Sequence, residues 1–269
     1  MNPFRQLLKR SGHQVPVGTW LTSASPLVAE AVGHAGLDWG VIDMEHSPLD
    51  LPLLVQMLQA IAGTRLVPVL RVPWNDPVMI KRVLEAGAQT LVVPFVQTAD
   101  EARAAVAATR YPPQGTRGMS GMGRSSRFGT AHDYFRTANG DIAVIAQLET
   151  PLAIERLEEI AAVDGVDALF IGPADLSAAM GYPGRFTHPS VTTAMSAAVR
   201  RCKAAGKPVG TVGATPETVT QYRAAGFDFI AIGSDIALMV QAAQASMVAL
   251  RGQHGDHVHT LSGGTDASA

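Results

Sequence analysis

Two carboxylates each follow a short apolar run, at the point where a buried strand is expected to end. Glu149 closes the run that begins at Ala143, and Asp175 follows the run 169–171 after the turn Gly172-Pro173. If the two strands are parallel neighbours, their carboxyl ends meet at one mouth and the two acids face each other. Oxygen ligands that leave room for water and substrate suit a hard divalent cation, so we expect a site for Mg²⁺, Mn²⁺ or Co²⁺.

Each acid also has an ordinary structural explanation. Glu149 could pair with a nearby cation such as Arg71, and Asp175 could simply favour the first turn of a helix through the helix dipole. Gln147 lies two residues before Glu149 and therefore faces the same side of the strand. Taken together, the three residues favour metal coordination.

Further polar residues fall at the ends of the second and third expected strands. Asp43 and His46 are three residues apart, which allows an acid to orient an imidazole as a general base. Glu45 lies between them, so the spacing leaves open which acid orients the ring. Arg71 has the planar fork that suits a carboxylate or an oxyanion, and its alternative role is a buried ion pair with Asp43 or Glu149.

A helix start is expected beside the second acid. The N–H groups of Ala174 and Asp175 lie in the first turn after Pro173, where no helical carbonyl accepts from them. They should point into the same mouth and can take a substrate carboxylate.

The positions of the lysines bear on which type of carbonyl or enolate mechanism is possible. The four lysines, Lys9, Lys81, Lys203 and Lys207, all fall away from the carboxyl ends of the expected strands. A Schiff-base mechanism is therefore hard to place, and carbonyl or enolate chemistry would depend on a metal as Lewis acid. The single cysteine, Cys202, falls within an expected helix, and the chain has no Gly-x-Ser-x-Gly motif.

Short β-rich runs alternate with amphipathic stretches along most of the chain. The strands are expected at 17–21, 39–44, 66–72, 90–94, 143–149, 168–171, 208–212 and 229–233, each followed by a helix. Eight such units in about 250 residues predict a closed (β/α)₈ barrel, the TIM barrel. A doubly wound open sheet fits less well, because the turn after the first strand is not glycine-rich.

Two segments depart from this rhythm. The stretch 111–140 is rich in Gly and Pro, and we interpret it as a long βα insertion, which is either a functional lid or a plain surface loop. Residues 253–269 lack an apolar period and are predicted to be a disordered tail, which leaves residues 1–252 as a single barrel domain. The tail histidines His254, His257 and His259 are better explained as solvated residues than as a metal site.

The composition excludes several classes of function. A formal net charge of -2 gives no reason to expect nucleic-acid or anionic-membrane binding. No apolar run is long enough for a spanning helix, and the N-terminus lacks an apolar signal core. A single cysteine allows no intramolecular disulfide and favours a reducing compartment, so we expect a cytoplasmic protein.

Four segments carry a resemblance to a known family. They are Val41-Ile-Asp43-Met-Glu-His46-Ser-Pro, Leu70-Arg71-Val-Pro, Gln147-Leu-Glu149-Thr and Phe170-Ile-Gly-Pro-Ala-Asp175-Leu-Ser. In types and order they resemble the HpcH/HpaI aldolases over about residues 4 to 250. Within that family the chain is most similar to class II pyruvate aldolases of the 4-hydroxy-2-oxoheptane-1,7-dioate type.

The resemblance implies a fold, an assembly and a reaction. The fold is a (β/α)₈ barrel whose last helix is swapped between subunits, usually in a hexamer of two trimers. The reaction is the reversible cleavage of a 4-hydroxy-2-oxo acid to pyruvate and an aldehyde, with a divalent metal and no organic cofactor.

The resemblance also implies roles for individual residues. Glu149 and Asp175 would hold the metal, and the amides of Ala174 and Asp175 would hold the pyruvate carboxylate. Arg71 would bind the keto oxygen, while His46, supported by Asp43, would relay protons through a metal-held water. The remaining residues expected to line the pyruvate site are Gln147, Gly172, Pro173 and Val212.

The second substrate is less well defined. The segment 118–127 falls where family members contact the aldehyde, and Arg124 and Ser125 are the candidate contacts. Arg124 or Arg127 could receive an acidic aldehyde tail, and either could instead be a solvent-facing loop charge. A decarboxylating, macrophomate-synthase-like enzyme acting on oxaloacetate is one alternative. A catalytically inactive barrel that serves as a binding subunit is another.

Overall fold

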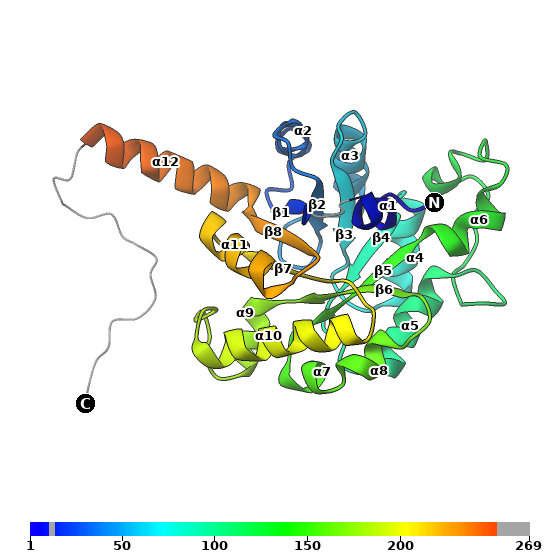
Figure 1. Ribbon diagram of the computed structural model, residues 1–269. Coiled ribbons are helices and arrows are strands. Elements are labelled where there is room, and N and C mark those ends of the chain that lie inside the picture. The colour runs from blue at the N-terminus through cyan, green and yellow to red at the C-terminus, as the bar shows by residue number, and fades with distance from the viewer. Residues whose placement is uncertain (11–13, 252–269) are drawn as a thin grey trace.

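Eight parallel strands pair in sequence order and close into a barrel in the computed structural model, which describes residues 1–10 and 14–251 (Figure 1). The strands are β1 (Val17–Leu21), β2 (Trp39–Asp43), β3 (Val67–Arg71), β4 (Thr90–Val93), β5 (Ala143–Leu148), β6 (Val166–Ile171), β7 (Val209–Gly213) and β8 (Phe229–Ser234). All eight predicted strands are present, and the predicted TIM barrel is confirmed. The tail predicted at 253–269 lies outside the described residues.

Helices follow the strands around the outside of the barrel. They are α1 (Pro3–Arg10), α2 (Pro26–His34), α3 (Leu51–Ile61), α4 (Pro77–Glu85), α5 (Ala99–Thr109), α6 (Tyr134–Asp141), α7 (Pro151–Glu155), α8 (Leu157–Ala161), α9 (Pro173–Ala179), α10 (Pro189–Ala204), α11 (Pro216–Ala225) and α12 (Asp235–Arg251), with a 3₁₀ turn at Arg124–Ser126. The helix predicted over 151–161 is broken at Arg156 into α7 and α8. α1 and α6 were not predicted.

Most helix starts are fixed by a capping side chain followed by proline. Thr150 accepts a hydrogen bond from the amide of Ala153, and Pro151 occupies the first helical position of α7. Asp76 and Pro77 do the same for α4. Proline costs nothing at this position because its missing N–H would have no helical partner. These starts set the βα loops at the carboxyl ends of the strands.

The barrel has a separate core inside the sheet. Alternate residues of the strands point inward, and the inner cluster includes Trp20, Trp39, Val69, Ile145 and Phe170. Phe4, from α1, closes the amino-terminal end of this cluster by packing edge-on against Trp39 and Phe229. The same alternation directs the side chains at the other ends of β2, β3 and β5 into the mouth.

The long glycine-rich stretch differs from its prediction. Residues 111–140 lie between α5 and β5, so they form an αβ connection at the amino-terminal ends of the strands, and the prediction of a βα insertion is wrong. The reason is that α5 already provides the helix of the fourth βα unit. Part of the stretch folds as α6, whose residues gave no clear apolar period.

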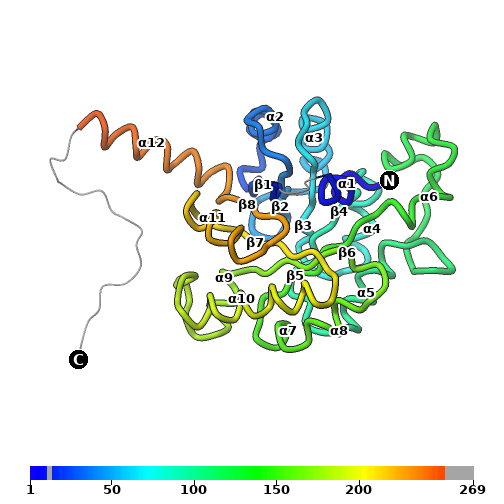
Figure 2. Tube along the Cα trace, viewed as in Figure 1, coloured from blue at the N-terminus to red at the C-terminus, as the bar shows by residue number. Residues whose placement is uncertain are grey.

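The last helix leaves the barrel. α12 projects away from the other helices (Figure 1), and the trace in Figure 2 shows the same course. It contacts chiefly β1 and β8, at its own first residues. Apolar side chains along it are exposed: Ile236, Met239, Val240, Met247, Val248 and Leu250. None of the described helices is long and apolar enough to cross a membrane.

Candidate active site at the carboxyl ends of the strands

Strand register brings an acid and an arginine together at the mouth. β2 and β3 pair with Asp43 directly beside Arg71. Nε and Nη2 of Arg71 donate to the two carboxylate oxygens of Asp43, and Nη1 lies 2.8 Å from Oε2 of Glu45. The guanidinium also lies 4.2 Å from the ring centroid of Trp20. Arg71 is therefore held on three sides, and the buried ion pair considered for it is present with Asp43 rather than Glu149.

The imidazole of His46 has a different acid beside it from the expected one. Nε2 of His46 lies 3.8 Å from Oε2 of Glu45, while Asp43 accepts from Arg71 and from the amide of Glu45. The His46 side chain is 62% exposed, so it is free to reach a substrate at the mouth. Glu45, not Asp43, is the acid placed to orient this ring.

Glu149 is buried and held at both oxygens. Oε2 accepts from the amide of Phe95 at 3.1 Å, and Oε1 accepts from Nε2 of Gln147. Burial first, and then the charges of Asp175 and Glu45, raise the pKa of Glu149 to about 7. Burial likewise raises the pKa of Glu45. The positive charge of Arg71 lowers this pKa in part, and the negative charges of Asp43 and Asp175 raise it further. The mouth thus gathers more negative charge than its own cation offsets.

Gly172 makes room beside Glu149. The β5–β6 register aligns Leu148 with Ile171, which sets Glu149 next to Gly172. A Cβ at position 172 would lie 2.6 Å from Oε1 of Glu149 and 3.1 Å from Nε2 of Gln147. Oε1 of Gln147 is buried and has no hydrogen-bond partner among the residues that the structure describes. Glycine at position 172 therefore allows the side chains of Glu149 and Gln147 to pack directly against the backbone.

Asp175 lies across from Glu149 in the first turn of α9. Gly172 caps this helix without a side-chain hydrogen bond, so the following amides have no capping partner. Pro173 is buried, whereas Ala174 and Asp175 are exposed to the mouth. Val212, on β7, packs against the inner cluster. Gly172, Pro173, Ala174 and Asp175 thus follow the end of β6, next to Glu149 at the end of β5, and Val212 lies near the end of β7.

The donor set fits a divalent cation. Burial raises the pKa of Glu149, and the negative charge of Asp175 adds to this effect. A cation there would offset these negative charges, and oxygen ligands suit Mg²⁺, Mn²⁺ or Co²⁺. Among the described residues, no three His, Cys, Asp or Glu side chains are grouped to hold one ion. Two carboxylates with open positions for water and substrate remain the fitting arrangement.

The two residues expected to contact the aldehyde lie elsewhere. Nη1 of Arg124 donates to the carbonyl of Ala86, and Oγ of Ser125 donates to Oε2 of Glu85. Ala86 follows α4 and precedes β4, so both contacts lie at the amino-terminal end of the barrel. Within this chain, Arg124 and Ser125 cannot reach the mouth, because the connection that carries them leaves α5 at the opposite end.

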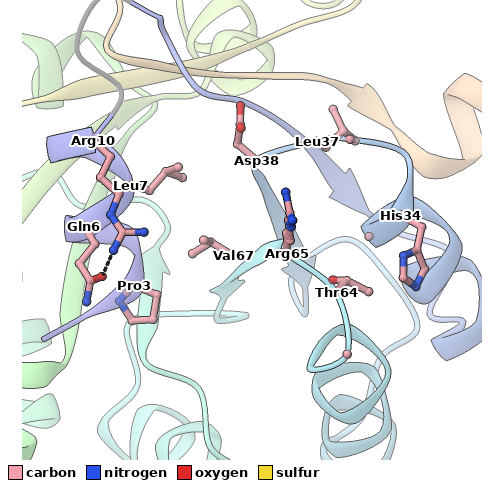
Figure 3. A pocket seen from close by; sticks show the side chains of 13 residues that line it. Pro3, Gln6, Leu7, Arg10, His34, Leu37, Asp38, Thr64, Arg65 and Val67 are labelled. Carbon is pink, nitrogen blue, oxygen red and sulfur yellow. Dashed lines mark hydrogen bonds between the residues drawn. The ribbon is translucent and has the colours of Figure 1, made fainter.

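A cavity of about 740 Å³ also opens at that amino-terminal end, between α1 and the turns after α2 and α3 (Figure 3). Its lining includes Arg10, His34, Asp38 and Arg65, all of them exposed. None of the predicted catalytic residues reaches it. The candidate catalytic residues gather instead at the carboxyl ends of the strands.

Some site residues were not found from the sequence. Trp20 was placed on a strand but not in the site, although strand alternation directs it inward beneath Arg71. The amide of Phe95 contacts Glu149 only because Phe95 adopts a left-handed backbone with φ 56°. No sequence signal announces that conformation for phenylalanine.

The chain is similar to known proteins over most of its length. The family model HpcH/HpaI aldolase/citrate lyase matches residues 17–242. A 2-dehydro-3,6-dideoxy-6-sulfogluconate aldolase from Pseudomonas putida is 49% identical, over 92% of this chain and 96% of its own. A 5-keto-4-deoxy-D-glucarate aldolase from Salmonella arizonae is 44% identical, over 87% and 91%.

A solved structure is also similar. It is that of an HpcH/HpaI aldolase/citrate lyase family protein from Burkholderia cenocepacia. It is 42% identical with a TM-score of 0.90, and the match covers 94% of this chain and 100% of that one.

Proposed function

This chain belongs to the HpcH/HpaI aldolase/citrate lyase family and is an aldolase, and we propose that it cleaves 4-hydroxy-2-oxo acids to pyruvate and an aldehyde with the aid of a divalent cation. The observation that carries the proposal is that two neighbouring carboxylates, Glu149 and Asp175, lie near the fixed guanidinium of Arg71 at the carboxyl ends of the strands.

Each residue at the mouth has a separate role in binding the substrate or the cation. Glu149 and Asp175 would hold the cation, which supplies a Lewis acid when bound. The amides of Ala174 and Asp175 bind the substrate carboxylate. The remaining N–H groups of Arg71 donate to the keto oxygen and stabilise the negative charge that grows there as the carbon–carbon bond breaks.

Proton transfer is assigned to the exposed imidazole. His46, with Glu45 beside it, accepts the proton of the C4 hydroxyl while the C3–C4 bond breaks and its electrons form the enolate. The aldehyde leaves, and a proton returned to C3 completes pyruvate. Trp20 and Asp43 keep Arg71 in place during these steps.

The second substrate is proposed to be a sugar-derived aldehyde. Both curated relatives named above carry the names of aldolases that act on deoxygenated sugar acids. Those names differ from the heptanedioate type, which stays an untested prediction for this chain. Because Arg124 and Ser125 lie at the far end of the barrel, they are proposed to contact the aldehyde only if another subunit brings them to the mouth.

An oligomer is also proposed. None of the other described residues covers the apolar side of α12, which supports its packing on a second copy, in the manner of a swapped helix. The double variant Met239→Glu/Met247→Glu, which changes two exposed residues on one face of α12, should reduce the particle mass in light scattering, whereas Gln241→Glu on another face of the same helix should not. An unchanged mass for the double variant would contradict this packing.

The reaction is tested by coupling pyruvate to a panel of aldehydes after the metal has been removed. Product should form when Mn²⁺, Mg²⁺ or Co²⁺ is returned and should cease in excess EDTA. Full activity in EDTA would contradict the metal-assisted reaction. Release of CO₂ from oxaloacetate, measured in parallel, would show whether the same site also decarboxylates.

A further inference from the structure

Two exposed aromatic rings form a ledge at the mouth, outside the residues that the proposed reaction uses. Trp74 and Phe95 stack with ring centroids 5.7 Å apart and an interplanar angle of 28°. Trp74 is 55% exposed and Phe95 is 38% exposed. Large apolar side chains are seldom left in solvent together without a partner.

The ledge is built on the loops next to the proposed chemistry. Trp74 lies three residues after Arg71, in the loop that follows β3, and Phe95 lies two residues after the end of β4. Since β3, β4, β5 and β6 are consecutive neighbours in the barrel, the ledge borders Glu149 on the side away from Asp175. A molecule that reaches from Asp175 across Glu149 meets these rings next.

The backbone at Phe95 ties the ledge to Glu149. Its amide donates to Oε2 of Glu149 at 3.1 Å, and its φ of 56° lies in the left-handed region. This conformation is uncommon for a bulky residue. Phe95 therefore contacts Glu149 through its backbone and Trp74 through its ring.

We propose that the stacked rings of Trp74 and Phe95 are the contact for the second substrate, against which the C–H face of a hydroxyaldehyde of three or more carbons packs during the aldol step. The inference rests on the proposed function, because it places the aldehyde relative to the pyruvate site. The aromatic faces contact only the C–H groups of such an aldehyde, so its hydroxyl groups keep their hydrogen bonds to water. A two-carbon aldehyde is too short to gain from the ledge.

The test separates the two halves of the reaction. Exchange of the C3 protons of pyruvate in D₂O, followed by NMR with Mn²⁺ or Mg²⁺ present, reports the pyruvate half alone. Initial rates of aldol addition at saturating pyruvate then give KM for D-glyceraldehyde and for acetaldehyde. The variants are Trp74→Ala, Trp74→Phe and Phe95→Gly, which keeps the left-handed backbone. Phe128→Ala, an exposed ring at the amino-terminal end of the barrel, is the matched control.

Trp74→Ala and Phe95→Gly should each raise KM for D-glyceraldehyde about fourfold to fifteenfold, which corresponds to the loss of one or two buried CH₂ equivalents. KM for acetaldehyde should change less than twofold in these variants. Trp74→Phe keeps an aromatic ring, so its KM for D-glyceraldehyde should stay close to the wild-type value. Phe128→Ala should have the same KM values as the wild type. Unchanged KM for D-glyceraldehyde in both variants would overturn the proposal.

Two other results would also overturn the ledge as a substrate contact. An equal loss of pyruvate exchange and aldol addition would assign the rings a purely structural role. A fall in particle mass by light scattering, together with lost activity, would assign them to a subunit interface. If the wild type itself exchanges no pyruvate protons with metal present, the proposed function fails, and the ledge proposal fails with it.

Discussion

The two carboxylate oxygens of Asp43 accept separate hydrogen bonds from Nε and Nη2 of Arg71, at 2.8 and 2.7 Å. Both side chains are buried, and the β2–β3 register places them side by side. This pair fixes the plane of the guanidinium, so that its remaining N–H groups have one direction in which to donate. Asp43 is thus a positioning residue for Arg71.

Asp43→Ala should lower the free energy of unfolding by about 3–5 kcal/mol, because it leaves a buried guanidinium with only Glu45 as a partner. Urea unfolding measures the change. Asp133→Ala, which removes an exposed pair with Arg136, should cost less than about 1 kcal/mol. Equal costs for the two substitutions would contradict the buried pairing.

His46→Asn should lower the aldol rate about 10²–10⁴-fold, as expected for the loss of a general acid–base group. Glu45→Gln should lower it in the same direction, because Glu45 is the acid beside the imidazole. The control is His34→Asn, an exposed histidine at the amino-terminal end, which should keep the wild-type rate. Steady-state kinetics decide the matter, and wild-type turnover in His46→Asn would remove the residue from the mechanism.

Gly172→Ala should weaken divalent-metal binding about 10–100-fold, as substitutions beside metal ligands commonly do. The added Cβ would lie 2.6 Å from Oε1 of Glu149 and would displace that carboxylate. Gly140→Ala, where no atom lies within 4 Å of the new Cβ, is the matched control. Calorimetric titration with Mn²⁺ compares them, and undiminished affinity in Gly172→Ala would argue against Glu149 as a ligand.

The metal-free protein should lose stability as the pH rises through about 7. The pKa of Glu149 is raised from 4.5 to about 7. A carboxyl group with a raised pKa in the folded state stabilises the fold fully below its unfolded pKa, and this contribution is lost as the pH rises through the folded pKa.

The measurement is urea unfolding in a chelator at about pH 5 and about pH 8. Glu149→Gln should show a smaller difference between the two pH values than the wild type, because its amide does not titrate. The same pH dependence in both proteins would show that the pKa of Glu149 is not raised by its surroundings.

The sequence predicted the barrel well because its signals are local. Proline and capping residues such as Thr150-Pro151 mark the helix starts, and apolar runs mark the strands. Since carboxyl ends of barrel strands share one mouth, the positions of Glu149, Asp175 and Arg71 followed from counting strands. Gln147 followed from strand alternation.

Other relationships depend on three-dimensional detail that no local pattern carries. Whether Asp43 pairs with His46 or with Arg71 depends on the β2–β3 register, which spacing along one strand does not reveal. The position of Arg124 was mispredicted because the stretch around it was assigned to the wrong end of the barrel. The amide of Phe95 required a backbone conformation that its residue type disfavours.

The central claim is that Glu149 and Asp175 hold a divalent cation to which pyruvate binds. The most direct measurement is titration of the metal-free protein with Mn²⁺, with and without pyruvate, followed by electron paramagnetic resonance. We expect one ion per chain, tighter binding when pyruvate is present, and loss of that binding in Glu149→Gln and Asp175→Asn. Stoichiometric binding that persists in a variant with both substitutions would contradict the account.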